Sequence, residues 1–286
     1  MSATRESFNV SHLKKIAVIT GEGKLPHSIY REMRRRSVET WSFCPLNLSV
    51  KVPKYVSKVI FNPLDLEGLF FELRERDIES VVFAGKITRR ITNSPSSNKS
   101  DDLFSREIFP ILQETDDKVL REIGKIFEFN GFDVRGINEL LPESLAVKGI
   151  LTKEKPSKHD NNDIIKAINY HKILSKADIG QSLIVSSGLC LAVESLPGTD
   201  AMLDFIKKEK SKDYLDSDTG GGILYKAPKT NQDSRFDIPV IGETTIRKAK
   251  GANLRGIALQ RDSVILLNKE KVIQLANQLR LFIVVL

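Results

Sequence analysis

The sequence predicts an α/β protein of two domains, an N-terminal one with a parallel sheet and a C-terminal one with a mixed α/β arrangement. Through the first half, short apolar runs rich in β-branched residues alternate with amphipathic helical patterns, which is typical of a parallel sheet. Residues 151–162 are polar and predict a linker. Beyond them, a hairpin pattern leads into mixed strands and helices. We therefore expect domains over residues 1–150 and 163–286.

The N-terminal elements begin with a strand, a glycine turn and a helix. Residues 16–20 are apolar and β-branched, as in a strand, and a helical pattern at 25–36 follows a Gly-x-Gly turn. An apolar stripe of helical period indicates a second helix over 64–76. The other expected elements are strands at 42–44, 58–61 and 80–84, a mobile loop at 92–102, a largely helical stretch at 109–130, and a return to the sheet at 131–137.

The C-terminal elements begin with a helix. Asp163 is a suitable N-cap for a helix over residues 164–175. Two apolar runs, 182–185 and 189–194, flank Ser-Ser-Gly and predict a hairpin. Thr199 is a suitable N-cap for the next helix. The remaining expected elements are a strand at 221–225, a helix at 244–250, strands at 256–259 and 264–267, a helix at 269–279 and a last strand at 282–286.

Composition excludes several classes of protein. Apolar residues make up 41% and charged residues 28% of the 286 residues, as in ordinary soluble proteins. Neither an apolar run of about 20 residues nor a signal-peptide core is present, so we expect a cytoplasmic protein. Two cysteines and four histidines argue against a disulfide framework and a histidine-rich metal centre. The net charge of +7 favours anionic partners, but aromatic residues do not alternate with basic ones, so nucleic acid is not expected.

Two glycine turns follow strands of the first domain. Gly21 and Gly23 lie between a strand and a helix, where backbone N–H groups bind anions well. This opening is Rossmann-like, but it lacks the third glycine of a dinucleotide site, and a plain tight turn explains it equally. Gly85 and Lys86 follow another strand, at the carboxyl edge where α/β sheets bind ligands.

Several polar residues allow both a structural and a chemical interpretation. Asp116 and Asp117 begin a helical stretch, where they offset the helix dipole or, with a distant carboxylate, hold a divalent ion. Gln181 and Glu194 can point from neighbouring strands into one site. No nucleophilic triad motif is present.

The segment from Lys226 to Gly242 concentrates two lysines, an arginine, two amides and two carboxylates before its Pro-x-x-Gly turn. Cations hold phosphate oxygens, and a carboxylate holds a metal ion or orients a water molecule. Chemistry on a phosphate anhydride needs both kinds of group. Taken alone, the segment is more typical of a solvated loop.

Eight motifs occur in order along the chain: Gly-x-Gly-x-Leu-Pro after the first strand, Phe-Ala-Gly85, Asp116-Asp117, Asp-Ile-Gly-Gln181, Ala-Val-Glu194, Gly-Thr-Asp-Ala-Met-Leu203, Lys-Ala-Pro-Lys229 with Gln232, and Arg-x-Asp-x-Pro-x-x-Gly242. This ordered set resembles the LpxI family of UDP-2,3-diacylglucosamine pyrophosphatases. The resemblance runs from about residue 13 onward and is strongest over 178–259.

The resemblance implies a hydrolase of the lipid A pathway (lipopolysaccharide synthesis) in Gram-negative bacteria. Such enzymes use water to cleave the pyrophosphate bond of UDP-2,3-diacylglucosamine, releasing UMP and 2,3-diacylglucosamine 1-phosphate (lipid X). The resemblance also implies a divalent cation, usually Mg²⁺, and an active site in the inter-domain cleft. The family's essential aspartate matches Asp237.

The candidate site combines the residues and the resemblance. Asp237 is the candidate catalytic residue and, with Asp116 and Asp117, a candidate metal ligand. Two positions depart from the family pattern: Lys86 stands where asparagine is frequent, and Val240 replaces a threonine. The candidate substrate-binding residues are Gly21, Gly23, Gly85, Gln181, Glu194, Thr199, Lys226, Lys229, Gln232 and Arg235.

The expected partner is the UDP-linked diacylated glucosamine substrate. Contact with the inner membrane is expected to be peripheral at most, and a homodimer is retained as a candidate assembly. Two other functions stay open at this point. One is a nucleotide-sugar or lipid-binding protein without hydrolysis, and the other is a Rossmann-type oxidoreductase that rests on the Gly21-x-Gly23 turn.

Overall fold

The computed structural model describes residues 13–86, 116–209, 221–230 and 232–286, without the side chains of Asp116 and Asp117. The chain forms two units. Unit 1 contains the chain up to Pro142 together with Asp233–Asp237, and unit 2 contains Glu143–Gln232 and Ile238–Leu286. The short piece Asp233–Asp237, called the 233–237 segment below, therefore belongs to unit 1 although its neighbours in sequence belong to unit 2.

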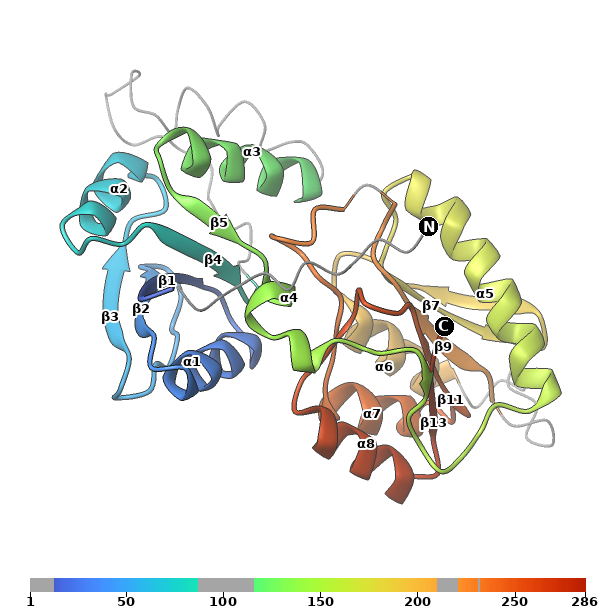
Figure 1. Cartoon of the computed structure of the whole chain (residues 1–286). Helices are drawn as coiled ribbons and strands as arrows, with labels where there is room; N and C mark the ends of the chain where they lie inside the picture. Colours follow the sequence, from blue (N-terminus) through green and yellow to red (C-terminus); the bar gives the residue numbers. More distant parts are fainter. Residues whose placement is uncertain (1–12, 87–115, 210–220, 231) are drawn as a thin grey trace, which may run out of the picture. The chain divides into compact units, whose positions relative to one another are not determined.

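Unit 1 is built on a five-stranded parallel sheet in the order β3-β2-β1-β4-β5 (Figure 1). This confirms the predicted parallel sheet. The order reverses between β1 and β4, which is the switch point at which doubly wound folds bind ligands. The strands are β1 (Lys15–Thr20), β2 (Glu39–Pro45), β3 (Ser57–Phe61), β4 (Ser80–Ala84) and β5 (Asp133–Arg135).

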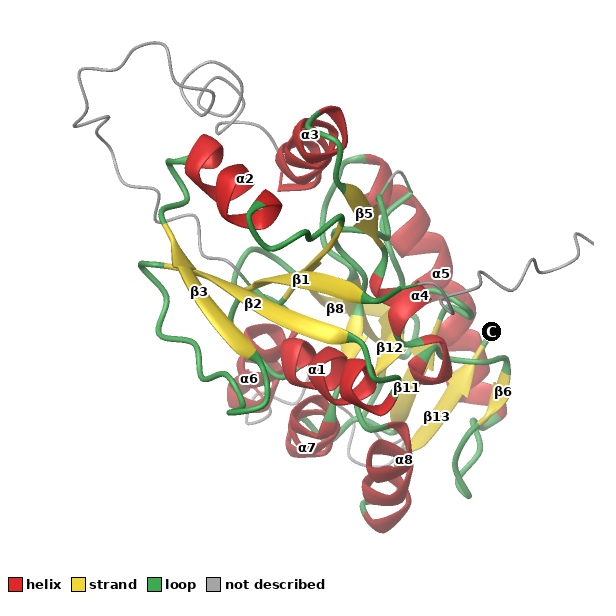
Figure 2. Ribbon diagram, turned by 60° about the vertical axis from the view of Figure 1, so that its left-hand side comes forward, coloured by secondary structure: helices red, strands yellow, loops and turns green. Residues whose placement is uncertain are grey.

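Helices cover both faces of this sheet. Helix α1 (Leu25–Arg35) lies on one face, and α2 (Leu66–Arg74) and α3 (Asp116–Phe129) lie on the other, as both views show (Figures 1 and 2). Strand alternation explains the two layers, because successive side chains point to opposite faces. Ala17 and Ile19 of β1 join the apolar cluster under α2 and α3. A short helix, α4 (Ile137–Leu140), follows β5. A 3-10 turn at Pro142–Ser144 then leads the chain into unit 2.

Unit 2 is built on a six-stranded mixed sheet in the order β6-β13-β11-β9-β7-β8. Strands β9, β11 and β13 are parallel, while the β13–β6, β9–β7 and β7–β8 pairs are antiparallel, which confirms the predicted mixed domain and its hairpin. The strands are β6 (Gly149–Ile150), β7 (Ser182–Ser186), β8 (Leu189–Val193), β9 (Ile223–Lys226), β11 (Gly256–Leu259) and β13 (Phe282–Val285), with a separate parallel pair β10 (Val240–Ile241) and β12 (Ile265–Leu266).

Each face of the unit 2 sheet has its own apolar core. Helix α5 (Lys158–Lys176) covers one face, where Ile164 and Ala167 meet side chains of β7, β9 and β13. The opposite face packs on α6 (Thr199–Glu209), α7 (Glu243–Gly251) and α8 (Lys269–Gln278) (Figure 1). The expected helices and strands of this half are thus present.

Two local predictions in unit 2 were wrong. The expected linker, 151–162, contains the first turn of α5, because Ser157 caps the helix and forms a capping box with Asp160. Asp163 is therefore not an N-cap but a buried residue inside α5. Its carboxylate accepts hydrogen bonds from the backbone N–H groups of Ser187 and Gly188, at 3.1 and 2.7 Å. It stabilises the β7–β8 turn instead.

Thr199 is the first residue of α6 rather than a residue preceding it, and its hydroxyl bonds to other side chains. The loop expected at 92–102 lies outside the described residues. In the part of the chain that the structure describes, no helix is long and apolar enough to cross a membrane.

Candidate functional site

Four polar side chains meet at the carboxyl end of β9, and we call them the buried cluster: Ser182 and Lys226, which are buried, and Glu194 and Thr199, which are partly buried. The fold brings them together because β7 runs antiparallel to both β9 and β8, so Ser182 begins β7 where β9 ends and Glu194 follows β8 at the same edge. Three of the predicted residues therefore share one place, which is the edge where parallel strands bind ligands. Sequence reasoning missed Ser182, although it directly follows the predicted Gln181.

The buried cluster is closed by ionic hydrogen bonds. The Lys226 Nζ donates to Thr199 Oγ1 at 2.6 Å and to Glu194 Oε2 at 3.2 Å. Thr199 donates to the same carboxylate oxygen at 2.9 Å, and Ser182 also donates to it. Lys226 is only 3% exposed. A buried ammonium requires a paired charge, and Glu194 supplies it.

A second ion pair follows the buried cluster along the chain. Lys229 Nζ lies 2.5 Å from Asp178 Oδ1, and the lysine side chain is 13% exposed. The side-chain oxygen of Gln232 accepts a hydrogen bond from the Lys229 backbone N–H at 2.8 Å. Gln181 contributes its backbone carbonyl, which accepts from the Ala227 N–H at 2.9 Å. The structure thus joins the Asp-Ile-Gly-Gln and Lys-Ala-Pro-Lys motifs.

A buried histidine packs beside these motifs and was missed by sequence reasoning. His171 of α5 meets the ring of Tyr225 edge-on, with centroids 5.4 Å apart. Its Nε2 is buried and has no hydrogen-bond partner among the described residues. Burial lowers the pKa of His171, against opposing contributions from the Ala227 backbone and the Glu194 charge. Burial also raises the pKa of Tyr225 to about 12.

Arg235 and Asp237 lie in the 233–237 segment and thus in unit 1. Arg235 donates from Nε and Nη2 to the Asp233 carboxylate, at 3.1 and 2.8 Å, and its Nη1 pairs with Glu128 of α3. The Arg235 hydrogen bonds lower the pKa of Asp233 and hold it ionised. The Asp237 backbone N–H donates to the Asp233 carbonyl at 3.2 Å. Arg235, which the sequence predicted to bind the substrate, therefore has two carboxylate partners within its own unit.

The two glycine turns of unit 1 meet each other at the switch point between β1 and β4. Gly21 N–H donates to the Ala84 carbonyl at 2.8 Å, and Glu22 and Lys86 exchange two backbone hydrogen bonds at 2.8 and 2.9 Å. A Cβ on Gly21 would lie 2.6 Å from the backbone of Gly85, so only glycine allows this approach. The contact gives both turns a structural explanation. At Gly23, where φ is +109°, the backbone lies in the region that favours glycine.

The described residues contain no preformed set of metal-ligating side chains. Among these residues, no group of three His, Cys, Asp or Glu side chains is placed to hold a metal ion. Asp116 and Asp117 begin α3, but their side chains are outside the description. Of the predicted metal ligands, only Asp237 has a described side chain.

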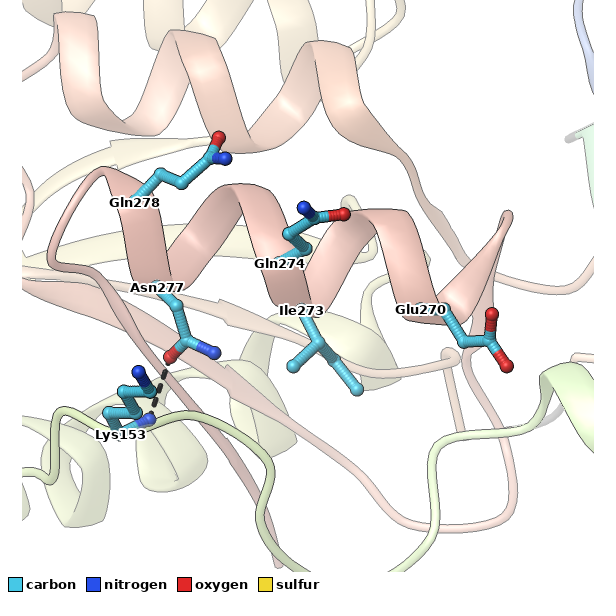
Figure 3. A pocket seen from close by; sticks show the side chains of 6 residues that line it. All are labelled: Lys153, Glu270, Ile273, Gln274, Asn277 and Gln278. Atoms are coloured by element: carbon cyan, nitrogen blue, oxygen red, sulfur yellow. Dashed lines mark hydrogen bonds between the residues drawn. The ribbon is translucent and has the colours of Figure 1, made fainter.

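A hollow on the surface of unit 2 lies away from the residues predicted as a site. Figure 3 shows side chains of α8 around it, with the Lys153 backbone N–H donating to Asn277 Oδ1 at 2.7 Å. Its lining consists of Lys153, Glu270, Ile273, Gln274, Asn277 and Gln278. None of the candidate catalytic, metal-binding or substrate-binding residues is among them, so the hollow does not support the predicted site.

Family models match nearly the whole chain. The model described as the LpxI N-terminal domain matches residues 15–144, and the model described as the LpxI C-terminal domain matches residues 147–284. A protein of Caulobacter vibrioides named UDP-2,3-diacylglucosamine pyrophosphatase LpxI is 34% identical over 219 residues, which are 75% of this chain and 77% of that protein. A crystal structure of isoflavone reductase aligns with 96% of this chain and 78% of its own, at 9% identity and a TM-score of 0.29, a likeness too weak to support a conclusion.

Proposed function

The chain belongs to the LpxI family, and from this membership we propose that it hydrolyses the pyrophosphate bond of UDP-2,3-diacylglucosamine. The products are UMP and 2,3-diacylglucosamine 1-phosphate, and the reaction belongs to lipid A biosynthesis. The observation that carries the proposal is the match to both domain models together with a relative of that name. The resemblance inferred from eight motifs is thereby confirmed.

We assign the binding of the negatively charged substrate phosphates to Lys226 and Lys229. Lys226 is the last residue of the parallel strand β9 and Lys229 follows it, and each lysine pairs with a carboxylate. A preformed ion pair keeps an ammonium oriented before the ligand arrives, so little reorganisation is needed when charge develops on a phosphate oxygen. Glu194 and Thr199 act through Lys226 in this scheme, and Gln232 orients the backbone of Lys229.

Asp237 is the proposed group that acts on the attacking water. A carboxylate can orient a water molecule and accept its proton as the oxygen attacks phosphorus. The electrons of the broken anhydride bond leave with the other phosphate. Asp237 carries this role because it matches the family's essential aspartate in the Arg-x-Asp-x-Pro motif.

We further propose a divalent cation, with Mg²⁺ as the first choice. The donor set fits the way in which Mg²⁺ is usually bound in phosphate sites, by one or two carboxylates plus substrate oxygens and water. Asp237 is one candidate ligand. Asp116 and Asp117, the first two residues of α3, are the other candidate ligands. When bound, the ion would neutralise the diphosphate and polarise a P–O bond.

The Asp237→Asn variant tests the catalytic role. We expect the variant to fold like the wild type and to lose release of UMP from UDP-2,3-diacylglucosamine, by about 10³-fold or more if the carboxylate is the base. Asp204→Asn is the matched control, because Asp204 is a half-exposed aspartate on α6 paired with Lys248. Near-wild-type turnover in the Asp237 variant, or equal losses in both variants, would remove Asp237 from the mechanism.

We also propose that the protein works in the cytoplasm, with peripheral contact at the inner membrane. The substrate is amphiphilic, and among the described residues no helix is suited to span a bilayer. Cell fractionation checks this location, since a salt wash should release a peripheral protein from membranes. Retention after the wash contradicts the proposal.

A further inference from the structure

Helix α3 contains a glycine in its interior, which is unusual because glycine costs a helix about 1 kcal/mol relative to alanine. Gly124 is buried, and the ring of Phe236 occupies the place where a side chain would be. A Cβ on Gly124 would lie 1.9 Å from Cζ and under 3 Å from both Cε atoms of that ring. The missing side chain therefore makes a slot for Phe236.

The slot lies in a row of three positions along α3. Arg121, Gly124 and Glu128 are spaced three and four residues apart, so they share one face of the helix. Glu128 pairs with Arg235, and Gly124 receives Phe236. The charge of Arg121 acts on the Asp233 carboxylate, in addition to the stronger effect of the Arg235 hydrogen bonds. One face of α3 thus meets three residues of the 233–237 segment.

Phe236 extends this attachment into the core of unit 1. Its side chain is 7% exposed and belongs to the same apolar cluster as Phe70, Phe83 and Phe127. The Phe83 and Phe236 ring centroids are 5.3 Å apart. The segment is also stiffened internally, since the backbone N–H groups of Phe236 and Asp237 both donate to the Asp233 carbonyl.

We propose that Gly124 and Phe236 are positioning residues for Asp237: the slot in α3 fixes the 233–237 segment to unit 1 and thereby fixes the carboxylate that follows Phe236. This inference rests on the proposed function for its effect on turnover. The attachment itself is a structural claim that can be measured without substrate.

The kinetic consequence is a selective loss of kcat. The lysines assigned to the substrate phosphates belong to unit 2, and the slot belongs to unit 1. A displaced 233–237 segment should leave those lysines as they are and move Asp237. Displacement of a catalytic group by about 1 Å can cost up to 10²-fold in rate. We therefore expect kcat to fall while KM changes little.

The test uses Gly124→Ala, Phe236→Leu and the double variant in the full-length protein. The added methyl group of Gly124→Ala should expel the ring and lower kcat about 10- to 100-fold, with α3 intact because alanine favours helix. Leucine lacks the Cε and Cζ atoms that the methyl group would meet. The double variant should therefore recover to within about threefold of the kcat of Phe236→Leu alone, a strongly non-additive result.

Phe70→Leu is the matched control. Phe70 lies in the same apolar cluster and is 1% exposed, but it comes from α2 and not from the 233–237 segment. It should lower the free energy of unfolding and leave kcat near the wild-type value. If Phe70→Leu lowers kcat as much as Gly124→Ala does, general loosening of the core explains the effect and the proposal fails.

Hydrogen exchange separates this inference from the proposed function. Gly124→Ala should accelerate amide exchange in the peptide that covers 233–237, and the double variant should restore its protection. Unchanged exchange and unchanged kcat in Gly124→Ala would overturn the positioning role. If Gly124→Ala shows the exchange effect but the wild-type protein releases no UMP, the proposed activity is refuted and the attachment stands.

Discussion

At the scale of single residues, the Lys226–Glu194 pair makes the sharpest stability prediction. Lys226→Met leaves the Glu194 carboxylate, which is only 13% exposed, without its cationic partner, and this should lower the free energy of unfolding by about 3 kcal/mol. Lys248→Met is the matched control, because its partner Asp204 is half exposed and such pairs contribute at most about 1 kcal/mol. Urea unfolding of both variants checks the difference. Equal losses would show that burial of the Lys226 pair is unimportant.

His171 makes a prediction for acid stability. The pKa of His171 is lowered in the folded protein, chiefly by burial, while the unfolded chain titrates near the ordinary value of about 6.5. As the pH falls below that value, the unfolded chain binds a proton that the folded protein does not, so stability decreases. His171→Phe should unfold with a weaker pH dependence between pH 6.5 and 5. An unchanged slope would mean that His171 titrates normally.

At the scale of elements, Asp163 connects α5 to the hairpin turn. Asp163→Ala leaves the N–H groups of Ser187 and Gly188 without their acceptor, which should cost about 2 kcal/mol of unfolding free energy. Asn162→Ala, at an exposed position of the same helix, should change it by less than about 0.5 kcal/mol. Thermal unfolding of the two variants distinguishes a turn anchor from a surface aspartate.

The elements themselves were largely predictable, because their signals are local. Apolar periodicity identified the strands and helices of both units. The start of α5 was missed although Ser157 and Asp160 carry the spacing of a capping box, since the polar composition around them also fits a linker. The role of Asp163 could not be predicted, because its partners lie in a turn more than twenty residues away.

The candidate site was predictable only in part, for the same reason. Spacing suggested that Glu194 and Gln181 point from neighbouring strands into one site. In the structure they flank the two strands of the hairpin, with Gln181 just before β7 and Glu194 just after β8. That Lys226 is buried, and paired with Glu194, depends on how β9 joins β7, which no local pattern encodes. The meeting of Gly124 with Phe236 likewise depends on packing between distant segments. Only an unexplained helix-interior glycine could have suggested it.

At the scale of the whole molecule, the chain does not divide into two consecutive domains. The predicted units were residues 1–150 and 163–286, whereas the chain enters unit 2 at Glu143 and returns to unit 1 for Asp233–Asp237. The Lys-Ala-Pro-Lys motif and the Arg-x-Asp-x-Pro motif are close in sequence, yet they belong largely to different units. Because Asp237 belongs to unit 1, the attachment of its segment to α3 bears directly on the proposed catalytic role of its carboxylate.

Product analysis with the purified protein tests whether the pyrophosphate bond is hydrolysed. The purified wild-type protein is incubated with UDP-2,3-diacylglucosamine, with and without Mg²⁺, and the nucleotide and lipid products are quantified together. We predict UMP and 2,3-diacylglucosamine 1-phosphate in equal amounts, with turnover dependent on the cation. Recovery of bound but intact substrate under all conditions would contradict a pyrophosphatase and indicate a binding protein.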